Sequence, residues 1–545
     1  MEALTIILLF LTSVVASNTI SRSALVALPL PLVQIALGAL IAQVTDFRIA
    51  LEPEIFLLLF IAPLLFLDGW RIPKEGLLRD RWTIIALALG LVLFTVVGAG
   101  FFIHWMIPAM PLAVAFALAA VLSPTDAVSV SAIAARVPIP KRLMHVLEGE
   151  SLLNDASGLV CLRFAIAAAV SGTFSFIEAT GTFVWLAVAG IAIGTGLTWI
   201  VTTAKDWFSQ RFGEDTGAQI LISLLIPFAA YILAEQAHAS GILAAVAAGI
   251  MMNVEEQSGR ASATTRIKRN AVWEAVQFAG NGAIFVLLGQ QLPGIVAGAR
   301  NVVWEAGHQN EIWLIIYIVA ISCVLIALRF LWAWASLGLI MFRAARHRQT
   351  IESPGWRLLA VTSVAGVRGA LTLAGIMTLP YALQDGSIFP ARDLAILLAA
   401  GTIILSLIVA NVTLPVLLKG VRLPEETLER EENGARVAAA QAAIAAVEKV
   451  LHETGKQGRK TDLYMEAGAR IIALYRQRIE SHTDTNRSEG HARDGDDIER
   501  RLRLVALRAE RSELYRFARA GRLPDELTRS LVREIDLMES RFSTR

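Results

Sequence analysis

Charged side chains that interrupt long apolar stretches are the residues of this chain best suited to chemistry. A charge in the middle of a membrane-spanning helix costs about 2.5–3.5 kcal/mol on insertion scales, and such residues usually face an ion pathway. The alternative is a set of ion pairs between helices without a role in transport, and it stays open above all for Glu235 and Arg163. The residues of this kind are Asp68, Asp126, Glu148, Glu150, Asp155, Arg163, Glu235, Arg329 and Arg368.

The densest group of polar residues runs from Glu148 to Asp155. At helical spacing Glu148, Ser151 and Asp155 share one face, whereas Glu150 and Asn154 share the neighbouring face. Asp155 lies about 20 Å into the predicted helix at 1.5 Å per residue, near the centre of a bilayer. Carboxylate, hydroxyl and amide oxygens are hard ligands that suit Na⁺ or Li⁺ rather than a soft metal. We therefore expect a cation site on this helix.

Two interruptions of apolar helices are predicted. Asp126 ends the sequence Ser123-Pro124-Thr125-Asp126, and a proline removes a backbone donor and opens a helix. Open backbone at membrane depth is tolerated where it lines a cavity, and its carbonyls suit a cation. Glycines flank Arg368 in the second interruption, at residues 366–370. Interruptions at corresponding places of two halves indicate inverted repeats with two crossed, broken helices, although a simple kink is the alternative at Pro124.

The elements that position these residues are predicted from hydropathy. The chain is 55% hydrophobic and 18% charged, with a mean hydropathy of +0.58. Runs of about 20 apolar residues are long enough to cross a bilayer and must be helical there. We predict an all-α polytopic membrane protein of about 13 transmembrane helices, in which 216–236 and 239–253 alternatively form one broken span. The predicted spans are 3–20, 24–43, 52–69, 82–106, 111–136, 142–170, 182–203, 216–236, 239–253, 270–292, 311–344, 356–383 and 391–419.

The distribution of basic residues predicts the orientation. Lys and Arg are concentrated in alternate loops, which places the N-terminus outside and the C-terminus in the cytoplasm of a multi-pass cell-membrane protein. The first apolar segment lacks a basic start and is expected to be a retained span rather than a cleaved signal peptide. Cys161 and Cys323 lie in apolar segments and are expected to be buried thiols, without a disulfide or metal framework.

The composition changes sharply after Leu418, so we divide the chain into a membrane domain, 1–420, and a cytoplasmic helical tail, 421–545. The tail is rich in Glu, Arg and Ala, with a polar linker predicted at 481–496. A solvated helical appendage or a dimer contact is the simplest interpretation of this tail. Helices are predicted near 425–454, 461–480, 497–520 and 525–541, the last one starting at Leu523-Pro524-Asp525-Glu526.

Several motifs across residues 1–420 occur together in a recognisable order. They are Ala62-Pro63-Leu64-Leu65-Phe66-Leu67-Asp68, Ser123-Pro124-Thr125-Asp126, Glu148 to Asp155, Ala234-Glu235 with Ser240-Gly241-Ile242-Leu243-Ala244, Arg329 in its apolar span, and Val367-Arg368-Gly369-Ala370. With these motifs the chain resembles the first monovalent cation:proton antiporter family, the sodium/proton exchangers. The resemblance implies thirteen helices, divided into a dimerisation part and a core part that moves. The first motif departs from the family pattern, because it has Pro63 where two prolines are common.

The resemblance also implies roles for the residues at these motifs. Asp155, preceded by Asn154, is the carboxylate that binds either Na⁺ or a proton. The residues that line or complete the ion site are Asp126, Thr125, Ser151 and Asp68. The expected ligands of the cation are Asp155, Asp126, Ser151 and Thr125. Glu150 is held by Arg329 in a structural ion pair, for which Arg368 is the competing partner. Arg368, near the broken helices, and Glu148 are supporting residues.

These expectations predict exchange of Na⁺, or Li⁺, for H⁺, which serves pH and sodium homeostasis. Because Asn154 adds no second titratable group, one cation for one proton is the expected ratio. The expected partners are a monovalent cation, H⁺, the lipid bilayer and a second copy of the chain, with no nucleic acid and no cofactor. A K⁺/H⁺ antiporter of the same fold is the main alternative. A remote alternative is an intramembrane aspartyl protease with Asp126 and Asp155 as its catalytic dyad, but this chain lacks the Gly-x-Gly-Asp motif expected of such an enzyme. A channel is the other alternative.

Overall fold

The computed structural model separates the chain into two compact units, residues 1–421 and 422–545, and each is described by itself. The residues whose structure is described are 2–22, 29–44, 53–71, 86–126, 130, 141–171, 176–256, 262–305, 312–346, 356–380, 389–419, 426–455, 461–483, 502–514, 516, 531–532 and 534–539.

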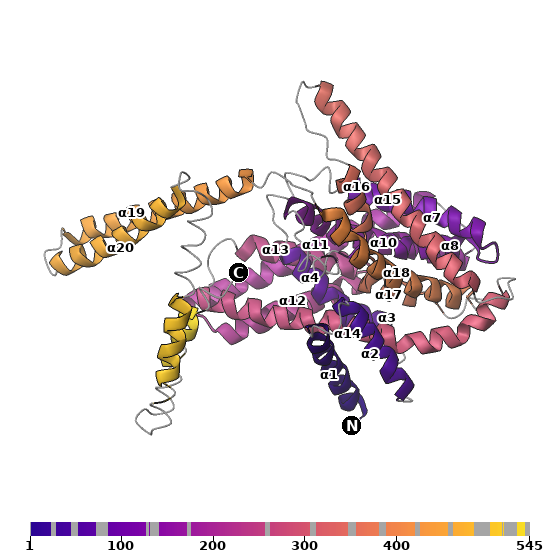
Figure 1. The fold of residues 1–545 in the computed structure, drawn as a ribbon, viewed down its shortest axis with the longest axis horizontal. Coiled ribbons are helices and arrows are strands. Elements are labelled where there is room, and N and C mark those ends of the chain that lie inside the picture. Colours follow the sequence, from indigo (N-terminus) through magenta and orange to yellow (C-terminus); the bar gives the residue numbers. More distant parts are fainter. Residues whose placement is uncertain are drawn as a thin grey trace. The chain divides into compact units, whose positions relative to one another are not determined.

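The first unit is helical throughout its regular elements, as predicted (Figure 1). Its elements are α1 Glu2–Arg22, α2 Leu30–Val44, α3 Pro53–Phe56, the π-helical turn η1 Leu57–Ile61, α4 Ala62–Arg71, the π-helical turn η2 Ala86–Leu91, α7 Val92–Met106, α8 Leu112–Leu122, α10 Lys141–Ser171, α11 Phe176–Phe212, α12 Thr216–Gln236, α13 Gly241–Glu256, α14 Ala263–Glu305, α15 Ile312–Arg346, α16 Trp356–Val364, α17 Ala370–Met377 and α18 Arg392–Leu418. Among the described residues, each predicted span overlaps one of these helices or consecutive ones.

The apolar character of the helices supports membrane crossing, while the count of thirteen crossings stays a prediction. Within the described residues, six helical stretches are long and apolar enough to span a membrane by length and composition. They are Ala88–Met106, Val184–Phe212, Thr216–Gln236, Thr264–Gly294, Ile312–Gly338 and Arg392–Leu418. The predicted spans 216–236 and 239–253, for which one broken span was the alternative, form two helices, α12 and α13. A turn at residues 237–240 joins them, and His238 in this turn has a positive φ of 52°.

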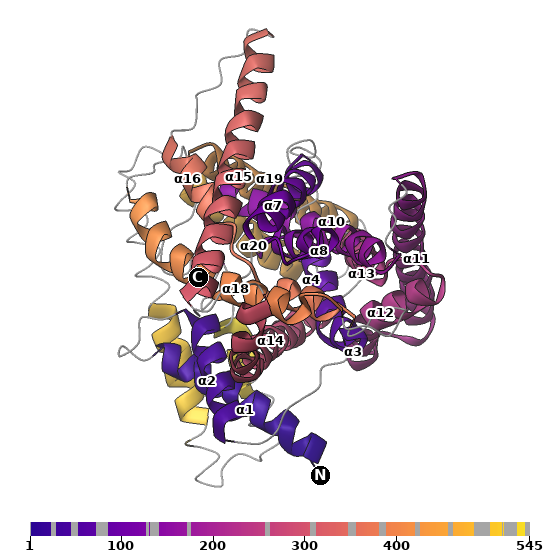
Figure 2. The same ribbon diagram turned by 90° about the vertical axis from the view of Figure 1, so that its right-hand side faces the viewer.

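The helices of the first unit pack as two bundles (Figures 1 and 2). The first bundle consists of α1, α2, η1, α4 and α11–α14, and the second consists of η2, α7, α8, α10 and α15–α18. Small residues allow close approach within the first bundle: a Cβ on Gly69 of α4 would lie 2.6 Å from the carbonyl oxygen of Val246 in α13. Gly249 of α13 in turn lies against the backbone of α4 at Phe66. The two helices are therefore held backbone to backbone.

Both predicted interruptions are present in the second bundle, and they meet. Helix α8 ends at Leu122 and its chain continues without helical structure through residues 123–126. Helix α16 ends at Val364, and α17 begins at Ala370 after another stretch without regular structure. The amide of Asp126 donates a hydrogen bond of 2.7 Å to the carbonyl oxygen of Val367, so the two open segments are joined directly. Residues 127–129 and 131–136 of the fifth predicted span lie outside the described residues.

The second unit begins with a helical hairpin. Helices α19, Glu426–Gly455, and α20, Thr461–Thr483, lie side by side (Figure 1). Residues 502–514 are also helical, and Arg511 there pairs with Asp536 and Glu539 at 2.7 and 2.5 Å. Most of the predicted linker and the predicted helix start at residues 523–526 lie outside the described residues.

Candidate functional site

Three carboxyl groups from distant parts of the chain face one cavity of about 50 Å³ between the two bundles. A cavity of this volume has room for about three water molecules or for a small, partly hydrated cation. The wall from the first bundle consists of Ile61, Leu64, Leu65, Asp68 and Asn281, and the wall from the second consists of Pro124, Thr125, Asp126, Ser151, Asp155, Gly369, Leu371 and Thr372. Of the six residues expected at the ion site, Asn154 is the one that does not line the cavity.

Helix α10 presents its two polar faces in different directions. Ser151 and Asp155, one turn apart, line the cavity. Glu150 and Asn154 are each only 1% exposed and lie behind this wall. The side chain of Glu148 is not among the described ones. A single helix thus supplies a hydroxyl and a carboxyl side chain to the cavity wall and, from its other face, groups that contact neighbouring segments.

A chain of hydrogen bonds behind the cavity wall connects an ion pair to the opened backbone of α8. Both carboxylate oxygens of Glu150 accept hydrogen bonds from the guanidinium of Arg329, one of them at 2.8 Å. The hydroxyl of Thr125 donates a hydrogen bond to the carboxylate of Glu150 over 3.3 Å and accepts one from the side-chain nitrogen Nδ2 of Asn154 over 3.0 Å. Arg329 also donates to the carbonyl oxygen of Thr362 over 2.9 Å. Bidentate contacts of this kind are geometrically specific, so α8, α10, α15 and α16 are held in register.

Arg368 serves the crossing of the broken helices rather than Glu150. Its Nε donates to the carbonyl oxygen of Leu122 over 3.0 Å, and Nη1 donates to that of Gly366. Leu122 is the last residue of α8, and the carbonyls at the end of a helix lack partners within the helix and carry partial negative charge. The buried guanidinium therefore satisfies backbone groups that the interruption frees.

The glycine next to Arg368 permits a close approach that no larger residue allows. A Cβ at Gly369 would collide with the carboxyl group of Asp126. At Gly366 an added Cβ would lie 2.9 Å from Cδ of Arg329. The glycines of this motif therefore do more than open the helix, because they make room for the charged side chains of the site.

Asn281 and Thr372 line the cavity but were not predicted to do so. Asn281 lies within α14 and lines the cavity from the first bundle. Both side chains carry oxygen atoms of the type that binds small cations. Neither is charged, so neither is conspicuous in an apolar segment. A polar residue at the centre of the predicted span 270–292 was the one available signal for Asn281.

Glu235 and Arg163, for which two interpretations were open, form an ion pair outside the cavity. Their side chains meet at 3.0 Å and are 37% and 42% exposed. Arg163 lies on α10 of the second bundle and Glu235 on α12 of the first, so the pair connects the bundles. Glu235 also accepts a hydrogen bond of 3.1 Å from the amide of Gly241, the first residue of α13.

Two helical bundles with a carboxylate-lined cavity between them, where two broken helices cross, define a secondary transporter of small cations. The model of the family "Sodium/hydrogen exchanger, transmembrane" matches residues 6–420, and the chain belongs to this family. It is therefore a multi-pass membrane transporter.

Individual relatives agree with this assignment. The chain is 40% identical to an uncharacterised Na⁺/H⁺ exchanger of Escherichia coli (strain K12), over 99% of both chains. It is 38% identical to a sodium, potassium, lithium and rubidium/H⁺ antiporter of Bacillus subtilis (strain 168), over 99% of this chain and 78% of the relative. The fold resembles that of the sodium proton antiporter of Methanocaldococcus jannaschii, with a TM-score of 0.55, 16% identity, and coverage of 77% of this chain and 98% of that one. The protease alternative finds no support in these matches.

Proposed function

We propose that this protein exchanges Na⁺ for H⁺ across the membrane through the cavity between its two bundles. The observation that carries the proposal is the convergence of Asp68, Asp126 and Asp155 with three hydroxyl side chains on that cavity. The six residues expected at the ion site are assigned as its binding residues, with Asn154 acting from behind the wall through its bond to Thr125. Asp155 is assigned as the group that exchanges the proton.

The mechanism follows from competition for one site. A carboxylate in so small a cavity is neutralised by a proton or by a cation, and not by both at once. Because the cavity wall is divided between the two bundles, a movement of one bundle against the other opens the same site to either side of the membrane. If this movement requires an occupied site, Na⁺ transport in one direction is coupled to H⁺ transport in the other.

The identity of the cation is the finer part of the proposal. Hard oxygen ligands in a cavity of about 50 Å³ suit Na⁺ and Li⁺. K⁺/H⁺ exchange is the second candidate, because the Bacillus subtilis relative is described as an antiporter of potassium and rubidium as well as sodium and lithium.

Proteoliposomes with an imposed pH gradient test both parts of the proposal. Addition of Na⁺ and Li⁺ is expected to collapse the gradient, with a larger response than addition of K⁺. A response to K⁺ that equals or exceeds the response to Na⁺ would favour the second candidate. Cation flux without any movement of protons would contradict exchange and indicate a channel.

The arrangement in the membrane is also proposed. The alternation of basic loops supports an N-terminus outside and a C-terminus in the cytoplasm of a cell-membrane protein. Two copies of the chain are proposed to form a homodimer, as the resemblance to the exchangers implies. Residues 1–420 are assigned as the exchanger domain and residues 421–545 as its cytoplasmic tail.

Exchange is expected to be electroneutral, because Asn154 supplies no second acid beside Asp155. A membrane potential imposed with valinomycin and K⁺ should leave the rate of Na⁺ uptake at a fixed pH gradient unchanged. Uptake driven by the potential would disprove the one-for-one ratio. The substitution Asn154→Asp is then the informative variant, since it adds a titratable group at this position.

The tail is expected to be dispensable for ion exchange, because every residue of the cavity precedes Leu418. A protein truncated after Arg422 should insert into the membrane and exchange Na⁺ for H⁺, with changes confined to pH dependence or dimer stability. The measurement is exchange per inserted molecule, compared with the full chain. A truncated protein that is inserted and folded but inactive would give the tail a direct part in transport.

A further inference from the structure

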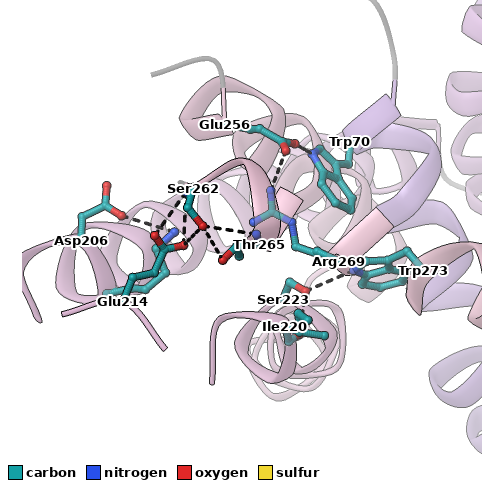
Figure 3. A network of polar contacts seen from close by, with 11 residues as sticks. Trp70, Asp206, Glu214, Ile220, Ser223, Glu256, Ser262, Thr265, Arg269 and Trp273 are labelled. Carbon is teal, nitrogen blue, oxygen red and sulfur yellow. Dashed lines mark hydrogen bonds and ion pairs between the residues drawn. The ribbon is translucent and has the colours of Figure 1, made fainter. Parts of the chain in front are cut away.

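A second polar cluster holds the end of α4, outside the cavity (Figure 3). The indole nitrogen of Trp70 donates to Glu256 of α13 over 2.5 Å, and Arg269 of α14 pairs with the other oxygen of the same carboxylate at 2.6 Å. The guanidinium of Arg269 also lies 4.9 Å above the centre of the Trp70 ring. These three residues, named here the Trp70 clamp, join the ends of three helices of the first bundle.

Two of the three residues of the Trp70 clamp are buried, Glu256 is partly exposed, and the clamp is continuous with an aromatic stack. Arg269 is 1% exposed and Trp70 is 6% exposed. Trp273, one turn after Arg269 on α14, stacks on Phe66 with ring centres 5.3 Å apart and meets the edge of Trp70 at 6.2 Å. A desolvated guanidinium over an indole face is among the stronger cation–π arrangements, so these rings and the charge restrict one another's positions.

The helical spacing of α4 relates the Trp70 clamp to the cavity. Phe66 and Trp70, four residues apart, lie on one face of α4, where α13 and α14 pack against them. Asp68 lies between them in sequence and about 160° away around the helix at 100° per residue. It faces the cavity, in which it is the one carboxylate supplied by the first bundle among the described lining residues. The same turn of helix is therefore held on one face and carries a cavity carboxylate on the other.

We infer that the Trp70 clamp fixes the rotation and depth of α4 and thereby places the Asp68 carboxylate in the cavity, so that Trp70, Glu256 and Arg269 are positioning residues for cation binding. This inference rests on the proposed function. Asp126 and Asp155 belong to the second bundle, so the distance between Asp68 and these two groups depends on how firmly α4 is held. Groups that orient a ligand without touching the ion typically change ion affinity by about 10- to 100-fold when they are replaced.

Conservative substitutions in the full-length protein test this inference. Glu256→Gln keeps an acceptor but removes the charge, and Trp70→Phe removes the indole donor but keeps an aromatic ring. In proteoliposomes each is expected to raise the apparent KM for Na⁺ by about tenfold, with a maximal rate within about twofold of the wild type. The double variant should be no worse than the more affected single variant, because both substitutions break the same contact.

Ser223→Ala is the matched control. The hydroxyl of Ser223 accepts a hydrogen bond of 3.2 Å from Trp273, so its loss perturbs the same buried region without touching Glu256 or Arg269. This variant is expected to lower the melting temperature and to keep the wild-type KM. An unchanged KM in both clamp variants, or an equal rise in KM in Ser223→Ala, would overturn the inference and leave the cluster a purely structural role.

A second measurement covers variants that reconstitute poorly and separates this inference from the proposed function. Na⁺ is titrated against the melting temperature of the detergent-purified protein, and the half-saturating Na⁺ concentration should rise by about tenfold in the clamp variants. An unchanged half-saturating concentration overturns the inference. A wild-type protein that is stabilised by Na⁺ but does not exchange it for protons would contradict the proposed function alone.

Discussion

Asp155→Asn is expected to abolish Na⁺/H⁺ exchange while leaving the protein folded. Asparagine has nearly the same shape as aspartate but can neither take up a proton nor balance the charge of a cation. Asp155 lines the cavity together with Ser151 from the same face of α10, so the substitution removes from the cavity wall the group proposed to exchange the proton. Exchange in proteoliposomes should fall to the background of empty vesicles, and the melting temperature should stay close to that of the wild type.

Cys161→Ala, on the same helix and away from the cavity wall, is the control for this prediction. It is expected to retain exchange. A purified, folded Asp155→Asn protein that exchanges Na⁺ for protons at close to the wild-type rate would remove Asp155 from its assigned role. Asp126 and Asp68 are then the remaining carboxylates on the cavity.

Glu150→Ala and Arg329→Ala are each expected to destabilise the protein strongly. The two side chains are 1% and 4% exposed, and each is the charge partner of the other. Removing one member of a buried pair leaves an uncompensated charge, which typically costs about 3–5 kcal/mol. The double variant should be less destabilised than the sum of the single variants, because it leaves no lone charge. Melting temperature and yield of inserted protein are the measurements.

An exposed ion pair in the tail provides the comparison for this cycle. Arg470 and Glu466 lie one turn apart on α20, 3.3 Å from each other and largely exposed. Such pairs contribute about 0.3–0.5 kcal/mol, so alanine at either position should change stability little. Strictly additive losses at Glu150 and Arg329 would show that these two side chains are not coupled, contrary to the contacts between them.

The helices and the polar faces of α10 were predictable because each depends on neighbouring residues along the chain. A run of about 20 apolar residues must be helical in a bilayer, whatever surrounds it. Ser151 and Asp155 share a face because they are four residues apart in a helix, and both line the cavity. The two interruptions followed from Pro124 and from the glycines beside Arg368, since these residues change the backbone locally.

Other features were decided by packing between helices far apart in sequence. Arg329 and Arg368 are both buried arginines, and the sequence left open which one pairs with Glu150. The structure places Arg329 against that carboxylate and Arg368 against the end of α8, because the crossing of the broken helices fixes which acceptors each guanidinium can reach.

Sequence by itself thus determined which residues are costly in a membrane and where the backbone opens, because cost and opening are local properties. Tertiary structure alone decided that the uncharged Asn281 faces the cavity. It also decided that Glu256 and Arg269 contact Trp70 on the face of α4 that points away from Asp68. Each of these residues is unremarkable in its own segment. Its role arises from the partners that packing brings within hydrogen-bond distance, and no spacing along the chain encodes that distance.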